Sequence, residues 1–391
     1  MIIPRLALRN LIGAGLRTWL NVIVLSFAFV AIIGMQGLYE GMNEQAAQAM
    51  IDAELGGGQY WHESYDPYDA LTLEAAHGKI TEPLKGMIDE GKASPILIIQ
   101  GTIYPKGRIQ SVLLKGIDPA QTVIDLPSHF LQESEGEAIP ALIGNRMAKN
   151  SGLIIGDSVT IQWRDTRGTF DAMDAIIVQV METSVQDIDI GQVWMPLKNL
   201  QDMALMTGEA TLVVMDKNVE EFPRVSGWSF KDLNFLLKDI RELVRVKTLG
   251  STILYIILLF LAMLAIFDTQ VLSIFRRHKE MGTLMALGFT RAKVIKLFTL
   301  EGAMHGVLAA IVAAIYGIPL LSYFASKGWA LPDMTDSYGF ALGEKLFPKY
   351  SIALIIGTTV LVLIMTTIVS YLPTRKIAKI KPTDALRGKA L

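Results

Sequence analysis

The chain lacks cysteine altogether and has few charged residues, which make up 19% of its 391 positions. Without cysteine it can form no disulfide, thiolate metal site or cysteine nucleophile. It also contains neither the G-x-x-x-x-G-K-[ST] pattern of P-loop nucleotide sites nor the H-E-x-x-H zinc motif. A net charge of −2 argues against a nucleic-acid partner. We therefore expect no catalytic residue, no metal and no cofactor in this chain.

Apolar residues, in contrast, make up 51% of the chain and gather in four blocks without Asp, Glu, Lys or Arg. A transmembrane helix requires about 20 such residues. The blocks cover residues 19–38, 249–267, 302–325 and 351–373, and the second continues beyond Asp268 to Ile274. The first block follows basic residues and could be a signal peptide. Its apolar core is too long for one and it lacks an A-x-A cleavage site, so we expect four spans.

The short segments that flank these blocks differ in their content of Lys and Arg. Residues 1–18, 276–296 and 374–391 carry an excess of basic residues, whereas residues 326–350 carry three basic and three acidic ones. Short basic segments remain in the cytoplasm. Both termini are therefore expected on the cytoplasmic side of a bacterial inner membrane, and the long segment after the first span on the outer side.

The long segment, residues 39–248, has the pattern of an α+β domain. Its two ends are predicted to be helical. Residues 39–55 stop at Gly56-Gly57-Gly58, and residues 230–247 form an amphipathic helix that runs into the second span. We interpret these helices as a rigid stalk. Between them, the pattern predicts strands at residues 96–104, 109–117, 158–163, 175–181, 193–195 and 211–215, and short helices at residues 81–90 and 145–151.

Ionisable side chains inside a span are costly and frequently functional. Asp268 lies near the cytoplasmic end of the second span, and Glu301 and His305 lie one helical turn apart at the start of the third. They could form a proton pathway or bond to neighbouring helices and the basic loop, and we favour the second interpretation. In the outer domain, Asp187 and Asp189 could bind a cation, although a solvated turn is the simpler interpretation.

The loop between the second and third spans, residues 276–296, contains a short amphipathic helix. Met281, Leu284 and Met285 form its apolar face. Gly288 is placed to end this helix, and Thr290 to cap the next one. Composition alone leaves open whether the loop is a basic interfacial turn or a docking element. The candidate docking residues are Arg277, Glu280, Met281, Gly282, Leu284, Met285, Leu287 and Gly288.

This loop resembles the signature of the MacB/FtsX-type ABC permeases, which has a basic run, then E-[IM]-G-x-L-x-A-L-G, then a helix ending in Leu-Glu-Gly. The matching residues are Glu280-Met281-Gly282, Leu284, Ala286-Leu287-Gly288 and Leu300-Glu301-Gly302. Residues 6–11 with Arg17-Thr18 resemble the N-terminal elbow helix of that family. Residues 378–387 resemble its I-x-P-x-x-A-L-R tail. The resemblance thus covers the whole chain and assigns the loop to docking on an ATPase.

Within that superfamily the outer domain resembles the lipoprotein-releasing (LolC/LolE) branch. The resemblance lies in Gly116-Ile117-Asp118-Pro119 and in the segment from Ile143-Gly144 to Gly156-Asp157-Ser158-Val159. The extra hairpin with which that branch would hook a periplasmic acceptor is not evident in the sequence.

The resemblance implies a permease subunit without an ATPase site of its own. It would extract a lipidated or amphipathic substrate, above all lipoproteins, from the outer leaflet of the inner membrane. The implied partners are a separate ABC ATPase, which binds ATP and Mg, and a second permease, identical or homologous. An export pump for small amphiphiles or peptides, and a signalling module that controls an envelope enzyme, remain as alternatives.

The predicted fold class is therefore an α-helical membrane protein of four transmembrane helices with a large α+β extracytoplasmic domain between spans one and two. The predicted order is an elbow helix (1–18), span one (19–38), the stalk and outer domain (39–248), span two (249–275), a coupling helix (276–296), span three (297–325), an outer loop (326–350), span four (351–373) and a cytoplasmic tail (374–391).

Overall fold

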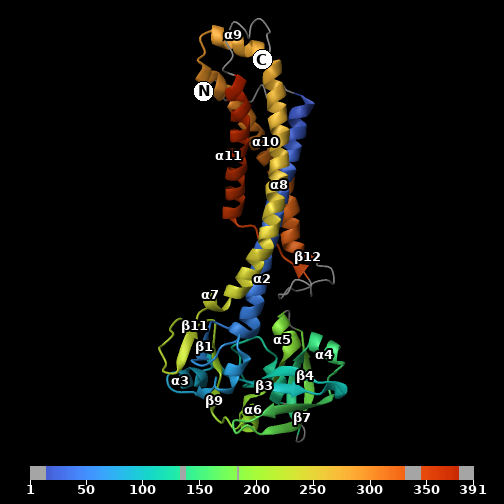
Figure 1. The fold of residues 1–391 in the computed structure, drawn as a ribbon, viewed down its shortest axis with the longest axis vertical. Helices are drawn as coiled ribbons and strands as arrows, with labels where there is room; N and C mark the ends of the chain where they lie inside the picture. Colours follow the sequence, from blue (N-terminus) through green and yellow to red (C-terminus); the bar gives the residue numbers. More distant parts are fainter. Residues whose placement is uncertain (1–14, 133–137, 183–184, 331–344, 378–391) are drawn as a thin grey trace. The chain divides into compact units, whose positions relative to one another are not determined.

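A computed structural model describes residues 15–132, 138–182, 185–330 and 345–377 of the chain (Figure 1). It divides into two compact units, and each is described by itself. The first unit comprises residues 1–42, 243–330 and 345–391, and the second comprises residues 43–242 and 331–344. Most of the predicted elbow helix, the middle of the predicted outer loop and most of the predicted tail lie outside the described residues.

Four long helices make up most of the first unit: α2 (Leu16–Met50), α8 (Lys238–Arg276), α10 (Arg291–Lys327) and α11 (Ile352–Ile377). Each is long and apolar enough to cross a membrane, with a mean hydropathy between 2.1 and 2.6 over its best window. A short strand pair, β12 (Trp329–Ala330) with β13 (Lys345–Leu346), lies between α10 and α11 in the chain. The predicted fold class of four membrane helices with an α+β domain is confirmed.

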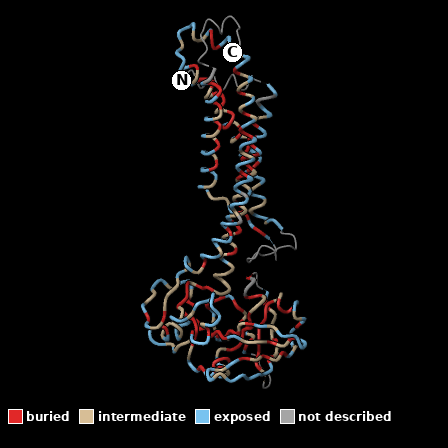
Figure 2. Tube along the Cα trace, in the orientation of Figure 1, coloured by how far each residue is buried: buried red, intermediate tan, exposed pale blue. Residues whose placement is uncertain are grey.

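The core of the helical unit is apolar and is built from all four helices. Val22 and Phe29 of α2 pack with Met263 and Ile266 of α8 and with neighbouring residues of α10 and α11. Many other large side chains remain exposed, such as Phe260, which is 64% exposed, and Figure 2 shows exposed residues along each helix. Soluble proteins rarely expose so many apolar side chains together. Lipid or a protein partner must therefore cover these faces.

Helices α10 and α11 approach closely because small residues line their contact. A Cβ atom added to Gly302 would lie 2.1 Å from Oγ of Ser370, and one added to Gly306 would lie 2.7 Å from Oγ1 of Thr366. Both distances are shorter than any normal contact, so only glycine fits at these positions. The small-x-x-x-small spacing is a common basis of helix packing in membranes, where helices gain stability from close contact.

The second unit is built on a nine-stranded mixed sheet in the order β11-β1-β10-β3-β4-β8-β5-β7-β6. Its strands are β1 (Gln59–His62), β3 (Ala93–Ile103), β4 (Gln110–Ile117), β5 (Ile139–Gly144), β6 (Ser158–Arg164), β7 (Phe170–Met181), β8 (Gln192–Pro196), β10 (Leu212–Met215) and β11 (Trp228–Lys231). A separate pair joins β2 (Gly78–Lys79) to β9 (Glu209–Ala210). The short helices are α3 (Leu84–Asp89), α4 (Asn145–Ser151), α5 (Gln186–Gly191), α6 (Leu197–Ala204) and α7 (Leu233–Leu236).

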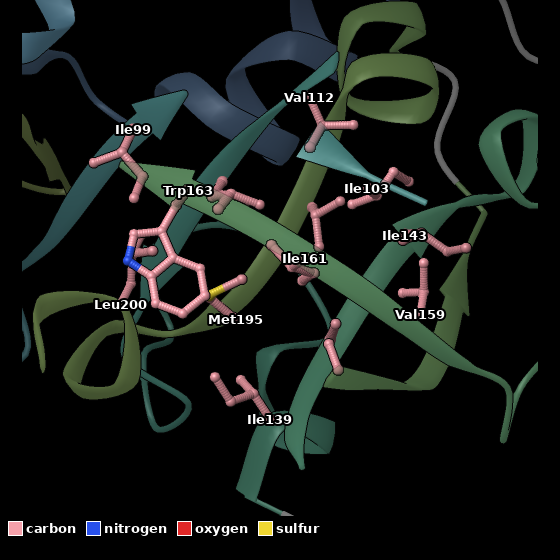
Figure 3. Packing of buried hydrophobic residues seen from close by; sticks show 14 of the residues in the cluster. Ile99, Ile103, Val112, Ile139, Ile143, Val159, Ile161, Trp163, Met195 and Leu200 are labelled. Carbon is pink, nitrogen blue, oxygen red and sulfur yellow. The ribbon is translucent and has the colours of Figure 1, made fainter. Parts of the chain in front are cut away.

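Six of these strands close on themselves, because β6 also pairs with the second half of β3. The closed ring β3-β4-β8-β5-β7-β6 encloses a dry core. Trp163, Met195 and Leu200 lie together in this core, surrounded by Ile and Val side chains (Figure 3). The indole N–H of Trp163 donates to the carbonyl of Met203 at 2.8 Å, so its one polar atom is satisfied.

All six predicted strands are confirmed, and helix α4 spans the predicted residues 145–151. Strands β1, β5 and β11 were not predicted. The predicted helix over residues 230–247 is wrong in its first part, because Phe230 lies in β11 opposite Tyr60 of β1. Helical structure starts at α7, where the side chain of Asp232 accepts from the N–H of Phe235, and is interrupted at Leu237 before α8. Strand pairing here overrides the helical periodicity of the sequence.

We predict that Gly306→Leu lowers the stability of the helical unit. The added side chain would push α10 away from Thr366, and such overpacking costs about 1–3 kcal/mol. Thermal unfolding in detergent measures the effect. Gly357→Leu is the matched control, because nothing lies within 4 Å of a Cβ atom at that position of α11. An unchanged unfolding temperature for Gly306→Leu would show that the close contact is not needed.

Candidate functional site

The candidate site is the turn between α8 and α10, which contains the short helix α9 (His278–Ala286). Arg277 separates α8 from α9, with φ −104° and ψ 15°. Gly288 follows α9 with φ +92°, a value that favours glycine, and reverses the chain. The hydroxyl of Thr290 then accepts from the N–H of Lys293 at the start of α10. The predicted roles of Gly288 and Thr290 as helix end and helix cap are confirmed.

One face of α9 packs against α8 and α10. Met281 is 2% exposed and lies in a cluster with Ile274 of α8 and with Val294, Leu297 and Phe298 of α10. Leu284 and Met285 border the same cluster, so the predicted apolar face is confirmed. Helix α9 is therefore a packed element of the helical unit. Its position depends on both neighbouring helices.

Arg277 connects three helices at this turn. One terminal nitrogen of its guanidinium contacts both carboxylate oxygens of Glu301 on α10, at 2.7 and 2.9 Å. Its Nε donates to Glu280 of α9 at 2.7 Å, and its guanidinium lies 4.9 Å from the ring centre of Phe298. Burial alone lowers the pKa of Arg277, but the carboxylates of Glu301 and Glu280 outweigh this and raise it, so the arginine stays charged.

The opposite face of α9 is exposed. Leu287, at the end of the helix, is 74% exposed, and the side chain of Glu280 is 57% exposed. Exposed basic residues flank this face on both sides: Arg276, Lys279, Arg291, Lys293 and Lys296. The predicted docking residues therefore fall into three groups. Met281 and Gly282 are buried and position the helix, and Glu280, Leu287 and Gly288 are exposed and available to a partner. The remaining three are half-buried: Arg277, Leu284 and Met285.

The three predicted polar residues of the spans do not form one cluster. Glu301 is 5% exposed and paired with Arg277. His305 is 3% exposed, and its Nδ1 lies 3.3 and 3.2 Å from the backbone carbonyls of Glu301 and Gly302. Asp268 lies on an exposed face of α8. Glu301 thus bonds to the basic loop, as the favoured interpretation expects.

Several buried polar or small residues near the site were not predicted. Gln270 of α8 is 4% exposed and lies close to Gly302, and Asn21 of α2 donates to Thr269 of α8 at 2.7 Å. Gly306 also belongs to this group. The sequence carried one usable signal, the Gly302-x-x-x-Gly306 spacing.

The candidate cation site of the outer domain has a different structure from the predicted solvated turn. Asp189 is 2% exposed and lies in α5, where its carboxylate pairs with Arg146 of α4 and accepts from the Arg146 N–H at 3.0 Å. Burial raises the pKa of Asp189 despite these contacts. The side chain of Asp187 lies outside the described part of the chain. Asp189 therefore joins two helices.

Comparisons with known proteins agree with this geometry. Residues 252–382, which contain α9, α10 and α11, match the family described as FtsX-like permease C-terminal. An ABC transporter permease of Methanocaldococcus jannaschii is 25% identical over 183 residues, 45% of this chain and 43% of the relative. The chain thus spans less than half the length of that relative.

Two further similarities extend outside the family match. The lipoprotein-releasing system transmembrane protein LolC of Xylella fastidiosa is 22% identical over 311 residues, 72% of this chain and 74% of that protein. The crystal structure of the extracellular domain of the noncanonic ABC-type transporter YknZ from Gram-positive bacteria overlaps 41% of this chain and 83% of that domain. That overlap has a TM-score of 0.26 and 14% identity.

We predict that Glu301→Gln destabilises the helical unit far more than Glu280→Gln does. Both changes remove a carboxylate that binds Arg277, but Glu301 is buried and Glu280 is exposed. Loss of a buried charged hydrogen bond costs about 1.5–3 kcal/mol. Loss of an exposed pair costs less than about 1 kcal/mol.

Thermal unfolding of the two variants in the same detergent measures the difference. Equal unfolding temperatures would mean that the Arg277–Glu301 pair does not hold the turn together.

Proposed function

Because the chain belongs to the MacB/FtsX/LolC permease superfamily, we propose that it is the membrane subunit of an ABC transporter that releases lipid-modified proteins from the outer leaflet of a bacterial inner membrane. A separate ATPase supplies the energy, and a second permease completes the complex. The similarity to LolC, a transmembrane protein of a lipoprotein-releasing system, and the apolar surface of the spans support this assignment.

Helix α9 is the proposed receiver of movement from the ATPase. Leu287 and Glu280 face outward where a partner can contact them, and the buried face of α9 is packed on α8 and α10. A displacement of α9 therefore moves both helices. Arg277 adds a charged connection from α9 to α10, so the turn moves as one body.

The observation that carries the substrate assignment is an apolar groove on the helical unit. Its volume is about 440 Å³, and it lies between α8 and α11. The residues that line it are Ile256, Leu259, Phe260, Met263, Leu264, Phe267, Leu361, Met365 and Val369. Such a surface suits acyl chains, because in the membrane they exchange contacts with lipid tails for close contacts with apolar side chains. It offers no polar group that would hold a polar solute.

The proposal predicts that lipoproteins occupy this groove. A photoreactive amino acid at Phe260 should cross-link to a lipid-modified protein in cells, whereas one at Ile315 of α10 should not. Ile315 is the control because it is 71% exposed but does not line the groove. Mass spectrometry identifies the cross-linked partner. Cross-links from Phe260 to small amphiphiles or peptides alone would favour an export pump, and the lipoprotein assignment would be wrong.

The orientation is a second part of the proposal, with both termini and α9 in the cytoplasm. Single cysteines can be added to this cysteine-free chain and probed with a membrane-impermeant thiol reagent. We expect Asp171→Cys, at an exposed position of β7, to react in intact cells. Thr283→Cys, at an exposed position of α9, should react only after permeabilisation. Labelling of Thr283→Cys in intact cells would contradict the orientation.

We further predict that Leu287→Asp weakens binding of the ATPase without unfolding the chain. A carboxylate placed in an apolar contact would have to be buried without a partner, and each loss of about 1.4 kcal/mol in binding free energy lowers the affinity tenfold. Co-purification measures binding, and ATP hydrolysis measures coupling, with the isolated chain as the baseline expected to hydrolyse none. Leu71→Asp is the control, since Leu71 is 84% exposed in the other unit. Normal binding by Leu287→Asp would exclude α9 as the contact.

A further inference from the structure

The helix that carries the first span ends on the sheet of the second unit in an unusual way. Helix α2 is followed directly by a π-helical turn, η1 (Ile51–Leu55), and then by Gly56, Gly57 and Gly58. π-Helical turns are rare and are frequently found at functional sites. The glycine run suggests a flexible hinge at first sight, but its contacts show a tightly packed segment. All residues discussed below, from Asn43 to Glu242, belong to the second unit.

Each of the three glycines is in close contact with a strand. A Cβ atom at Gly56 would lie 2.3 Å from the carbonyl oxygen of Met215, and one at Gly57 would lie 2.4 Å from that of Asp216. At Gly58 it would lie 2.7 Å from the ring of Phe230. Gly56 and Gly58 also have φ values of +57° and +132°, which favour glycine. Larger residues do not fit at these positions, because the backbone there is in direct contact with β10, the residue that follows it, and β11.

Two ion pairs fasten η1 to the sheet. The carboxylate of Glu54 pairs with the ammonium of Lys115 on β4, whose side chain is only 5% exposed and lies 5.0 Å from the ring centre of Trp194. Asp52 pairs with Lys217, and its carbonyl accepts from the N–H of Asp125 at 2.7 Å. Lys115 lies at the middle of the sheet, so the end of α2 is attached to the domain's centre.

The same attachment extends to the segment that leads into the second span. The side chain of Gln59 donates to the carbonyl of Glu54 at 2.9 Å and accepts from the indole N–H of Trp61 at 2.7 Å. The ring of Trp61 meets that of Phe235 in α7 edge-on, with 5.8 Å between the ring centres. A chain of contacts therefore links η1 through β1 to α7.

We propose that η1 and Gly56–Gly58 form a force-bearing anchor that transmits movement of α2 to the outer domain, with Glu54 and Lys115 as its positioning residues. The inference rests on the proposed function, in which an ATPase moves the helices of the first unit, and adds that this movement reaches the second unit through α2. A hinge at the glycines would absorb such movement, whereas a segment wedged between strands and held by a buried ion pair passes it on. The anchor is also linked to α7 through Gln59 and Trp61 of β1, so both helical connections act on the same sheet.

The test uses the assembled complex of permease and ATPase. Glu54→Gln with Lys115→Met removes both charges together, which avoids leaving one unpaired in the interior. The readout is the change in amide hydrogen exchange at residues 59–62 and 212–215 when nucleotide is added. We expect this change to fall at least about fivefold, a typical size for coupling between sites. The unfolding temperature and the assembly with the ATPase should match those of the wild-type complex.

Two controls and a second variant make the test decisive. Glu74→Gln removes an exposed pair with Arg164 in the same unit and should leave the exchange response intact. Gly57→Ala, which clashes with the strand, should reduce the response, and Gly191→Ala, which meets nothing within 4 Å, should not. If the double variant is unstable, the comparison of Gly57→Ala with Gly191→Ala decides whether the anchor transmits the nucleotide response.

A full nucleotide response in both anchor variants would overturn the anchor, as would a wild-type complex without any such response. The readout does not depend on the substrate. A wild-type complex that responds to nucleotide but releases no lipoprotein would contradict the proposed function and leave the anchor supported.

Discussion

The charged contact between Arg277 and Glu301 determines how the turn between α8 and α10 can be built. A carboxylate that is 5% exposed requires a charged partner, because an unpaired buried charge is strongly unfavourable. Arg277, at the break between α8 and α9, supplies that partner and also contacts Glu280. The charged contact therefore stabilises the break at Arg277. It fixes where α9 begins and which of its faces packs inward.

Glycine allows two backbone segments to pack closely at two separate places in this molecule. In the helical unit, Gly302 and Gly306 let α10 contact α11, and in the outer unit Gly56 and Gly57 let the chain run against β10 and its continuation. In each case the glycine marks a tight contact. Gly191 and Gly357, in contrast, have open space around the missing Cβ atom. In the proposed transporter, the packed glycines are the ones that can pass displacement from one element to its neighbour.

The sequence predicts those parts of the structure whose cause is local. The four spans, the six strands rich in β-branched residues, the glycine end of α9 and the cap at Thr290 all follow from nearby residues. Strand β5 was missed because its second residue is Pro140, and proline is unfavourable in a strand that is paired on both sides. Phe230 was misassigned because its partner Tyr60 is 170 residues away in the chain. At the site, periodicity identified the buried face of α9. It could not show that Arg277 reaches Glu301, because that contact depends on how three helices meet.

The use of polar residues in the spans explains why an apolar substrate is the better proposal. Asn21 bonds to Thr269, Glu301 bonds to Arg277, and the hydroxyls of Ser370 and Thr374 donate to backbone carbonyls of their own helix. These groups are occupied by contacts within and between helices, so they are poorly placed to replace the water shell of a polar solute. The groove between α8 and α11 has the opposite character, because side chains of Leu, Ile, Phe, Met and Val line it. In the proposed function, a substrate that binds at this surface has its acyl chains moved out of the lipid. Because α9 packs on α8 and α10, a shift of α9 displaces helix α8, which lines the groove.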